Sequence, residues 1–259
     1  MLQAVEKGKT TIYRRYIGER DGVESMVREE DEITSTILGP LEFFSPHETY
    51  KLWQHILNGV GFFKFLPSYP PESISIEFWP RQYIANSVKY IEPDAIIRMI
   101  WPNEVRILLI ELKWHAPLNP KDQLHKQWLQ FLGADEREHA LHLFIAPDIS
   151  SGIEAINYEG AGGNIWGNKL ILMSWLQFQS ILLKLTNTSY SISRWVILIS
   201  KFLEKIGIRK FTGFRHVLNN ITLNNSMNDN IFWHQFSWSR LINYPCLPEK
   251  TPTLVFYNS

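Results

Sequence analysis

The 259-residue sequence has one cysteine and no cluster of metal-binding cysteines or histidines. Cys246 cannot form an internal disulfide, and no group of Cys and His residues has the spacing of a zinc site. These absences exclude a disulfide-stabilised secreted domain and a zinc module. Together they fit a protein that works in a reducing compartment.

Long apolar runs are also missing. The longest apolar stretch, from Leu170 to Leu185, is interrupted by five polar residues, which is too many for a helix inside a bilayer. The N-terminus lacks the apolar region of a signal peptide. We therefore expect a cytoplasmic protein that has no membrane partner.

An excess of charge is absent as well, since Lys plus Arg and Asp plus Glu both number 26. The whole-chain argument for a polyanion partner therefore fails. The charge is nevertheless unevenly divided, because residues 1–145 hold 16 basic and 20 acidic side chains and residues 146–259 hold 10 and 6. The second part of the chain is mildly basic.

Hydrophobic residues make up 45% of the chain, which is typical of a globular protein with a large core. Residues 1–28 are polar and predict an N-terminal arm, residues 29–190 predict the folded core, and residues 191–259 predict a helical and loop-rich C-terminal extension. An acidic first turn and apolar residues at helical spacing predict a helix from about Glu30. Further helices are expected at 47–58, 119–132, 175–185 and 193–206, and strands at 74–79, 94–101, 105–113, 141–146 and 169–174. This order predicts an α/β core with a mixed central sheet flanked by helices.

The most informative spacing lies in the predicted hairpin of strands 94–101 and 105–113. If Pro102-Asn103 forms the turn, facing residues have numbers that add to 205, so Asp94 stands opposite Glu111. Two carboxylates roughly 4.5–5.5 Å apart repel each other unless a cation lies between them. Oxygen ligands of this kind suit Mg²⁺.

Lys113 follows Glu111 by two residues, so both side chains lie on one face of the strand. A lysine beside a metal and a phosphate can stabilise charge or, if its pKa falls, act as a base. The alternative is an exposed ion pair at a strand end, worth under about 1 kcal/mol. The apolar run ILLIELKW favours a functional role, because a buried carboxylate is costly without a reason.

Pro93-Asp94 followed by Glu111-Leu112-Lys113 resembles the motif of the PD-(D/E)XK nuclease superfamily, and Glu30-Asp31-Glu32 resembles its acidic N-terminal helix. The resemblance covers under half of the chain. It implies a restriction-endonuclease-like core of order αβββαβ and a Mg²⁺- or Mn²⁺-dependent phosphodiesterase.

The resemblance also implies a role for single residues. Asp94, Glu111 and the carbonyl of Leu112 would bind the metal, Lys113 would position or activate water, and a helix acid would complete the site. Glu30 is the favoured acid, while Glu29, Asp31 and Glu32 compete with it, and all four also suit a helix N-terminus.

Members of this superfamily often carry a glutamine on the helix after the lysine strand. Gln123 and Gln127 are four residues apart, so they share one helix face and could contact a phosphate or Lys113. The alternative is that this face is solvated.

A run of basic residues near the predicted C-terminal helix is the candidate nucleic-acid contact. Such residues supply phosphate affinity with little sequence information, and the alternative is a solvated helix end. The expected partner is nucleic acid, DNA in preference to RNA, and a homodimer or a partner protein stays open. A catalytically inactive scaffold that binds nucleic acid or protein is the alternative function, and restriction, repair or defence against mobile DNA is the expected context by fold analogy. The contact residues are Lys201, Lys205, Lys210 and Arg215.

Overall fold

A computed structural model describes residues 29–84, 89–114, 118–185 and 188–210. The predicted arm (residues 1–28) and the greater part of the predicted extension (residues 211–259) lie outside the described residues. One compact unit contains all of the described residues and ends at Lys210.

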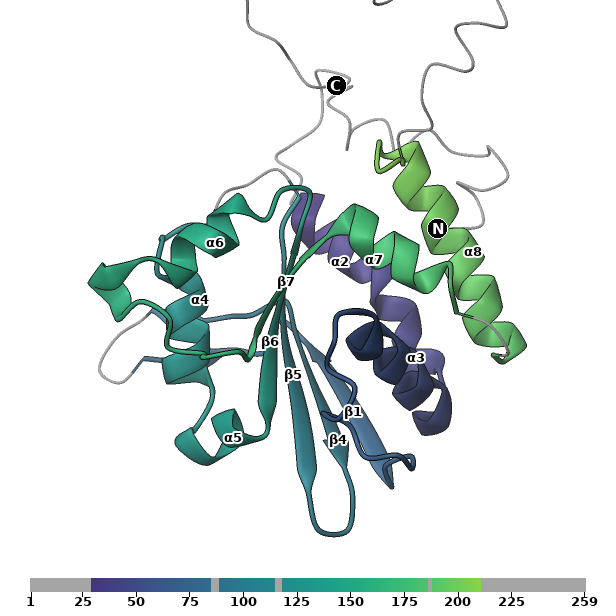
Figure 1. Ribbon diagram of the computed structural model, residues 1–259, viewed down its shortest axis with the longest axis horizontal. Helices are drawn as coiled ribbons and strands as arrows, with labels where there is room; N and C mark the ends of the chain where they lie inside the picture. Colours follow the sequence, from purple (N-terminus) through teal and green to yellow (C-terminus); the bar gives the residue numbers. More distant parts are fainter. Residues whose placement is uncertain (1–28, 85–88, 115–117, 186–187, 211–259) are drawn as a thin grey trace, which may run out of the picture. The chain divides into compact units, whose positions relative to one another are not determined.

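A mixed five-stranded sheet forms the centre of this unit, with strand order β1-β4-β5-β6-β7 (Figure 1). The first three strands pair antiparallel, and β5, β6 and β7 pair parallel. The five strands are β1 (Ser73–Phe78), β4 (Ala95–Ile100), β5 (Val105–Leu112), β6 (Ala140–Ala146) and β7 (Leu170–Ser174), and the short strands β2 (Gln82–Tyr83) and β3 (Tyr90–Ile91) pair separately. The predicted α/β class and mixed sheet are confirmed.

Helices cover both faces of the sheet (Figure 1). One face packs against four helices in a cluster that includes Leu108, Ile110 and Leu112 of β5. The other face, which includes Ile107 and Leu109, packs against shorter helices. Because both faces of β5 are buried, this strand is central, as its apolar run predicts. The first group is α2 (Glu29–Ile37), α3 (Pro46–Gly59), α7 (Trp175–Leu182) and α8 (Tyr190–Lys205), and the second is α4 (Gln123–Lys126), α5 (Ala134–Glu138) and α6 (Ser150–Ile156).

Local sequence explains the helix ends that matter here. Ser45 and Glu48 form a reciprocal capping box at the start of α3, with Pro46 in the first turn. Helix α2 ends at Ile37, and a 3-10 segment, Gly39–Phe43, follows it. Gly39 and Pro40 therefore lie in the first turn of the segment that follows the end of α2.

The helix predicted over residues 119–132 is partly wrong. Helix α4 begins only at Gln123, and it passes directly into a single π-helical segment, Gln127–Phe131. Pro120 therefore lies before the helix and not in its first turn. Single π-helical turns of this kind are frequently found at functional sites.

Two further differences concern helices. The sequence patterns did not predict α5 and α6, and α8 begins three residues before the predicted Ser193. Helix α8 packs against α7 and α2, and the indole Nε1 of Trp195 donates to the Ile37 carbonyl at the end of α2 at 3.0 Å. It thus belongs to the same compact unit as the sheet. None of the helices in the described part of the chain combines the length and apolar character that a membrane crossing requires.

Candidate active site

The predicted hairpin places the two acids as expected. Ala95 pairs with Ile110 and Ile100 pairs with Val105, so the register is the one that a Pro102-Asn103 turn predicts. The turn closes with a hydrogen bond from the Trp101 N–H to the Glu104 carbonyl. Asp94 therefore enters β4 beside Glu111 near the end of β5. Both side chains are almost completely buried, with 8% of Asp94 and 2% of Glu111 exposed.

Glu111 is held by three side chains. The ammonium of Lys113 lies 2.7 Å from Oε1. The amide Nε2 of Gln123 donates to Oε1 at 2.6 Å, and the amide Nε2 of Gln127 donates to Oε2 at 2.6 Å. The glutamines predicted to border the site thus belong to it, although they contact Glu111 and not Lys113. The solvated alternative is wrong for Gln127, which is 1% exposed.

Glu30 is the helix acid that reaches the site. Its Oε2 lies 3.3 Å from the ammonium of Lys113, and its Oε1 accepts a hydrogen bond from the backbone N–H of Trp114 at 3.0 Å. These contacts join the first turn of α2 to the end of β5. Lys113 therefore bridges Glu30 and Glu111, and its side chain is only 11% exposed.

Asp94 is held by the backbone. Its Oδ2 accepts a hydrogen bond from the N–H of Leu112 at 2.6 Å. The N–H and C=O of one strand residue point toward the same neighbouring strand, so the Leu112 carbonyl is directed to the side of Asp94 as well. Among the described residues, Oδ1 of Asp94 has no hydrogen-bond partner.

Burial and mutual repulsion dominate the electrostatics of these groups. Burial and then the charge of Glu111 raise the pKa of Asp94 well above its usual value, against the Leu112 hydrogen bond. Burial also raises the pKa of Glu111, although Lys113 opposes this effect. For Lys113, burial lowers the pKa, but the charges of Glu111, Glu30 and Asp94 outweigh it and raise the pKa overall. Lys113 is therefore an ammonium at neutral pH.

Carboxylate oxygens of the kind gathered here are those that a hard divalent cation prefers. Three carboxyl groups, those of Glu30, Asp94 and Glu111, surround one ammonium, so the fully ionised cluster has an excess of negative charge. Burial and, after it, the charge of Glu111 raise the pKa of Asp94, and Oδ1 of Asp94 has no hydrogen-bond partner among the described residues. In the part of the chain that the structure describes, no three His, Cys, Asp or Glu side chains are arranged to hold an ion. One or two carboxylates completed by water and substrate oxygens are typical of Mg²⁺.

The predicted nucleic-acid contacts are only partly described. Lys201 and Lys205 lie exposed on the last turns of α8, Lys210 is exposed beyond it, and Arg215 lies outside the described residues. In Figure 1 the C-terminal end of α8 and the first turn of α2 point toward the same end of the sheet. Their role as phosphate contacts stays a prediction.

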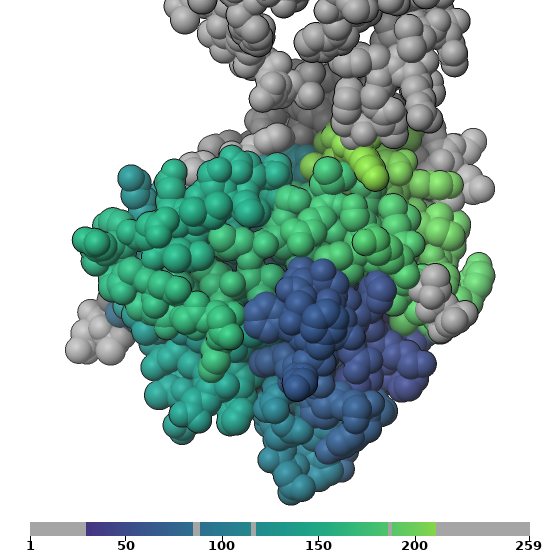
Figure 2. Space-filling view, viewed as in Figure 1, coloured from purple at the N-terminus to yellow at the C-terminus, as the bar shows by residue number. Residues whose placement is uncertain are grey.

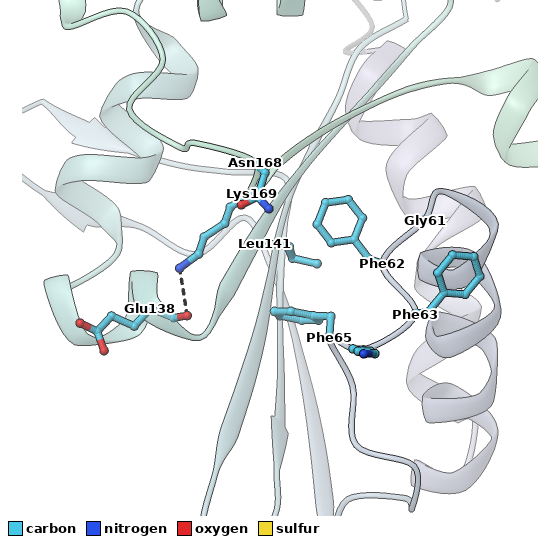
Figure 3. Close-up of a pocket in the computed structure, with 9 residues that line it drawn as sticks. Gly61, Phe62, Phe63, Phe65, Glu138, Leu141, Asn168 and Lys169 are labelled. Carbon is cyan, nitrogen blue, oxygen red and sulfur yellow. Dashed lines mark hydrogen bonds between the residues drawn. The ribbon is translucent and has the colours of Figure 1, made fainter.

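A hollow of about 420 Å³ lies away from this cluster, where β6 and β7 begin. Phe62, Phe63 and Phe65 line it on one side, and Lys169 lines it on the other (Figure 3). The Lys169 ammonium donates to the Glu138 carbonyl at 3.0 Å. Figure 2 shows the segment after α3, in dark blue, against the green surface of residues later in the sequence. The hollow is not lined by Glu30, Asp94 or Glu111.

Sequence patterns missed two residues that reach the site indirectly. His142 on β6 and Trp166 in the loop before β7 continue the hydrogen bonds of Gln127 into the core. The spacing of His139 and His142 gave no sign of this, because Gln127 and Trp166 are distant in sequence. Only the alternation of β6, which points His142 to the same face as Phe144, could have suggested it.

No family model matches the chain, and no curated protein or solved structure matches it either.

Proposed function

We propose that this chain is a divalent-metal-dependent phosphodiesterase that hydrolyses nucleic acid, with DNA as the preferred substrate, on a restriction-endonuclease-like core. One observation carries the proposal: Asp94, Glu111 and Lys113 meet at one end of a buried hairpin, together with Glu30 from α2 and two glutamines from the following helix. The order of elements, from α2 through β1, β4 and β5 to α4 and β6, supports the same core.

Asp94, Glu111 and the Leu112 carbonyl would hold Mg²⁺ or Mn²⁺. When bound, such an ion polarises a phosphate oxygen and lowers the pKa of a bound water. Burial and, after it, the charge of Glu111 raise the pKa of Asp94, and a bound cation would offset the negative charge of both carboxylates. Gln123 and Gln127 keep both oxygens of Glu111 in a fixed orientation through their amides.

Lys113 acts as a charge and not as a base. Its raised pKa keeps the ammonium protonated, so it stabilises negative charge that develops on the phosphate as water attacks and the P–O bond breaks. Glu30 and Glu111 hold the ammonium from two sides and fix its position. Among the two roles that the sequence leaves open for Lys113, the electrostatic one is favoured.

A binding scaffold without catalysis is the second candidate function. It is favoured by the contacts of Glu111, whose two oxygens already have three donors within the chain. A carboxylate whose oxygens are all hydrogen-bonded within the protein can have a purely structural role. Asp94 argues against this alternative, since one of its oxygens has no partner among the described residues and its burial costs free energy.

The test is incubation of the full chain with plasmid, linear duplex, single-stranded DNA and RNA, in the presence of Mg²⁺, Mn²⁺ or EDTA. Cleavage that needs the metal and is lost in Asp94→Asn supports the proposal, and the substrate that is cut fastest separates DNA from RNA. Glu138→Gln is the matched control, because it removes an exposed carboxylate at the other end of the sheet. Wild-type protein that binds nucleic acid but never cuts it with either metal would overturn the proposal in favour of the scaffold.

A further inference from the structure

A buried chain of hydrogen bonds leads from the core to Glu111. The indole Nε1 of Trp166 lies 3.2 Å from Nδ1 of His142, and Nε2 of His142 lies 3.1 Å from Oε1 of Gln127. The Gln127 amide Nε2 then donates to Glu111 at 2.6 Å. Trp166 lies in the loop ahead of β7, His142 lies on β6, and Gln127 lies in the π-helical segment.

The direction of every bond in this chain follows from its first member. An indole N–H can only donate, so Nδ1 of His142 must accept and carries no proton. In the neutral ring the proton is then on Nε2, which donates to the Gln127 oxygen. With its oxygen engaged in this way, the Gln127 amide can present only its NH₂ group to Glu111. Because the Trp166 indole can only donate, it fixes the position of the proton on His142 and thereby the orientation of the Gln127 amide.

Packing holds the chain in place. His142, Gln127 and Trp166 are 0%, 1% and 3% exposed, so water does not compete for their hydrogen bonds. Trp128 stacks on the His142 ring with an interplanar angle of 6° and a centroid distance of 6.1 Å. The π-helical segment supplies both Gln127 and Trp128, and therefore the irregular turn aims two side chains at one histidine.

His142 stays neutral in this environment. Burial, followed by the neighbouring His125, lowers the pKa of His142 to about 3. The ring therefore keeps one proton at neutral pH. A reversed Gln127 amide would set its oxygen against the carboxylate of Glu111 and its NH₂ group against the protonated Nε2 of His142, and both contacts are unfavourable at this burial.

We infer that His142 and Trp166 are positioning residues, which lock the Gln127 amide and thereby hold Glu111 ready to bind a metal. The inference rests on the proposed function in one respect, namely that Glu111 is a metal ligand. Partners of this kind around a ligating residue typically change metal affinity by roughly 10–100-fold when they are removed. Neither residue touches the substrate or the metal, so both act only through Gln127.

The first part of the test concerns the tautomer. In ¹⁵N-resolved NMR of the metal-free protein, His142 should show a protonated Nε2 and an unprotonated Nδ1, and Trp166→Phe, which keeps a ring but removes the donor, should perturb the Nδ1 signal. This measurement needs neither metal nor activity, so it tests the hydrogen bonds from Trp166 to Gln127 even if the protein cleaves no nucleic acid. A protonated Nδ1 in the wild type would overturn the inference.

The second part compares His142→Leu with His142→Gln by titration calorimetry with Mn²⁺ alone. Leucine removes the donor to Gln127, and we expect Mn²⁺ affinity to fall roughly 10–100-fold. The amide of glutamine can donate at the same place, so His142→Gln should recover most of the affinity. Where cleavage is measured, kcat should fall with the affinity while KM for nucleic acid stays unchanged.

Leu143→Ala is the control for a merely structural effect. Leu143 is fully buried next to His142 but belongs to the cluster on the opposite face of the sheet, so this variant should lower the melting temperature without changing Mn²⁺ affinity. Wild-type Mn²⁺ affinity in a folded His142→Leu protein, or a loss in Leu143→Ala as large as in His142→Leu, would overturn the inference. Absence of Mn²⁺ binding in the wild type, with the expected tautomer present, would instead overturn the proposed function and the positioning role of the chain toward a metal.

Discussion

Replacing Asp94 by asparagine should stabilise the metal-free protein. An asparagine oxygen can still accept the Leu112 hydrogen bond, while the charge that is buried beside Glu111 is removed. Because burial and Glu111 raise the pKa of Asp94 above its unfolded value, the folded state keeps its proton more strongly than the unfolded chain does. The stability that this provides is present below the unfolded pKa of about 3.9 and is lost as pH rises through the folded pKa.

The size of the effect follows from the same linkage. Each pH unit by which the folded-state pKa exceeds the unfolded one costs the wild type about 1.4 kcal/mol above both values. A folded unit of about 150–250 residues changes its melting temperature by roughly 2–4 °C per kcal/mol. We therefore expect Asp94→Asn to melt about 3–6 °C higher than the wild type for each such unit near pH 8, and at the same temperature below about pH 3.

Thermal unfolding in EDTA at several pH values measures this difference. Addition of Mn²⁺ should then reverse the order, because a ligand at 100 times its Kd stabilises the wild type by about 2.7 kcal/mol and should not bind the variant well. Glu138→Gln serves as the control with an exposed carboxylate. A wild type that is more stable than Asp94→Asn in EDTA near pH 8 would refute the reasoning, since the carboxylate would then be favourably held without a metal.

Three further predictions follow from the site and the core. Lys113→Ala should reduce cleavage by about 10² or more while the fold and nucleic-acid binding persist, and full activity would contradict the electrostatic role of the ammonium. Gly152→Val should destabilise the protein by at least about 1–3 kcal/mol in denaturant unfolding, because a Cβ at Gly152 would lie 2.6 Å from a Leu172 methyl and 2.9 Å from the Phe144 ring; unchanged stability would show that the core can yield there. Removal of the basic side chains should weaken binding equally for all sequences and reduce the salt dependence by about one counterion per lost contact, whereas an unchanged salt slope would leave them as a solvated surface. The alanine substitutions for this last test are at Lys201, Lys205, Lys210 and Arg215.

The hairpin could be predicted because its rules are local. Turn position fixes strand register, and strand register fixes which side chains face each other, so Pro102-Asn103 was sufficient to place Asp94 beside Glu111. Alternation along β5 likewise separated Leu108 and Ile110 from Ile107 and Leu109. Only the family resemblance favoured Glu30 over its three acidic neighbours, because the packing of α2 decides which acid reaches Lys113 and local rules do not determine that packing.

The helix after β5 was harder to predict for a physical reason. Apolar residues at helical spacing describe the average repeat, and a π-helical segment departs from that repeat by only one residue per turn. Its consequence is large, since Gln127 becomes buried and contacts both Glu111 and His142. Short helices such as α5 and α6 contain too few residues to show a period, so tertiary contacts determine them.

Asp94 and Glu111 differ in a way that bears on how the site would work. Glu111 receives two amide donors and an ammonium, and these keep its carboxylate in one orientation before any ligand arrives. Asp94 receives a single backbone N–H and keeps one oxygen without a partner among the described residues, so its charge state depends on what else enters the site. Metal binding requires deprotonated carboxylates, and the group with the more strongly raised pKa must release its proton. Asp94 is therefore the residue through which ion binding and pH are coupled, while Glu111 and the hydrogen bonds behind it supply the fixed geometry.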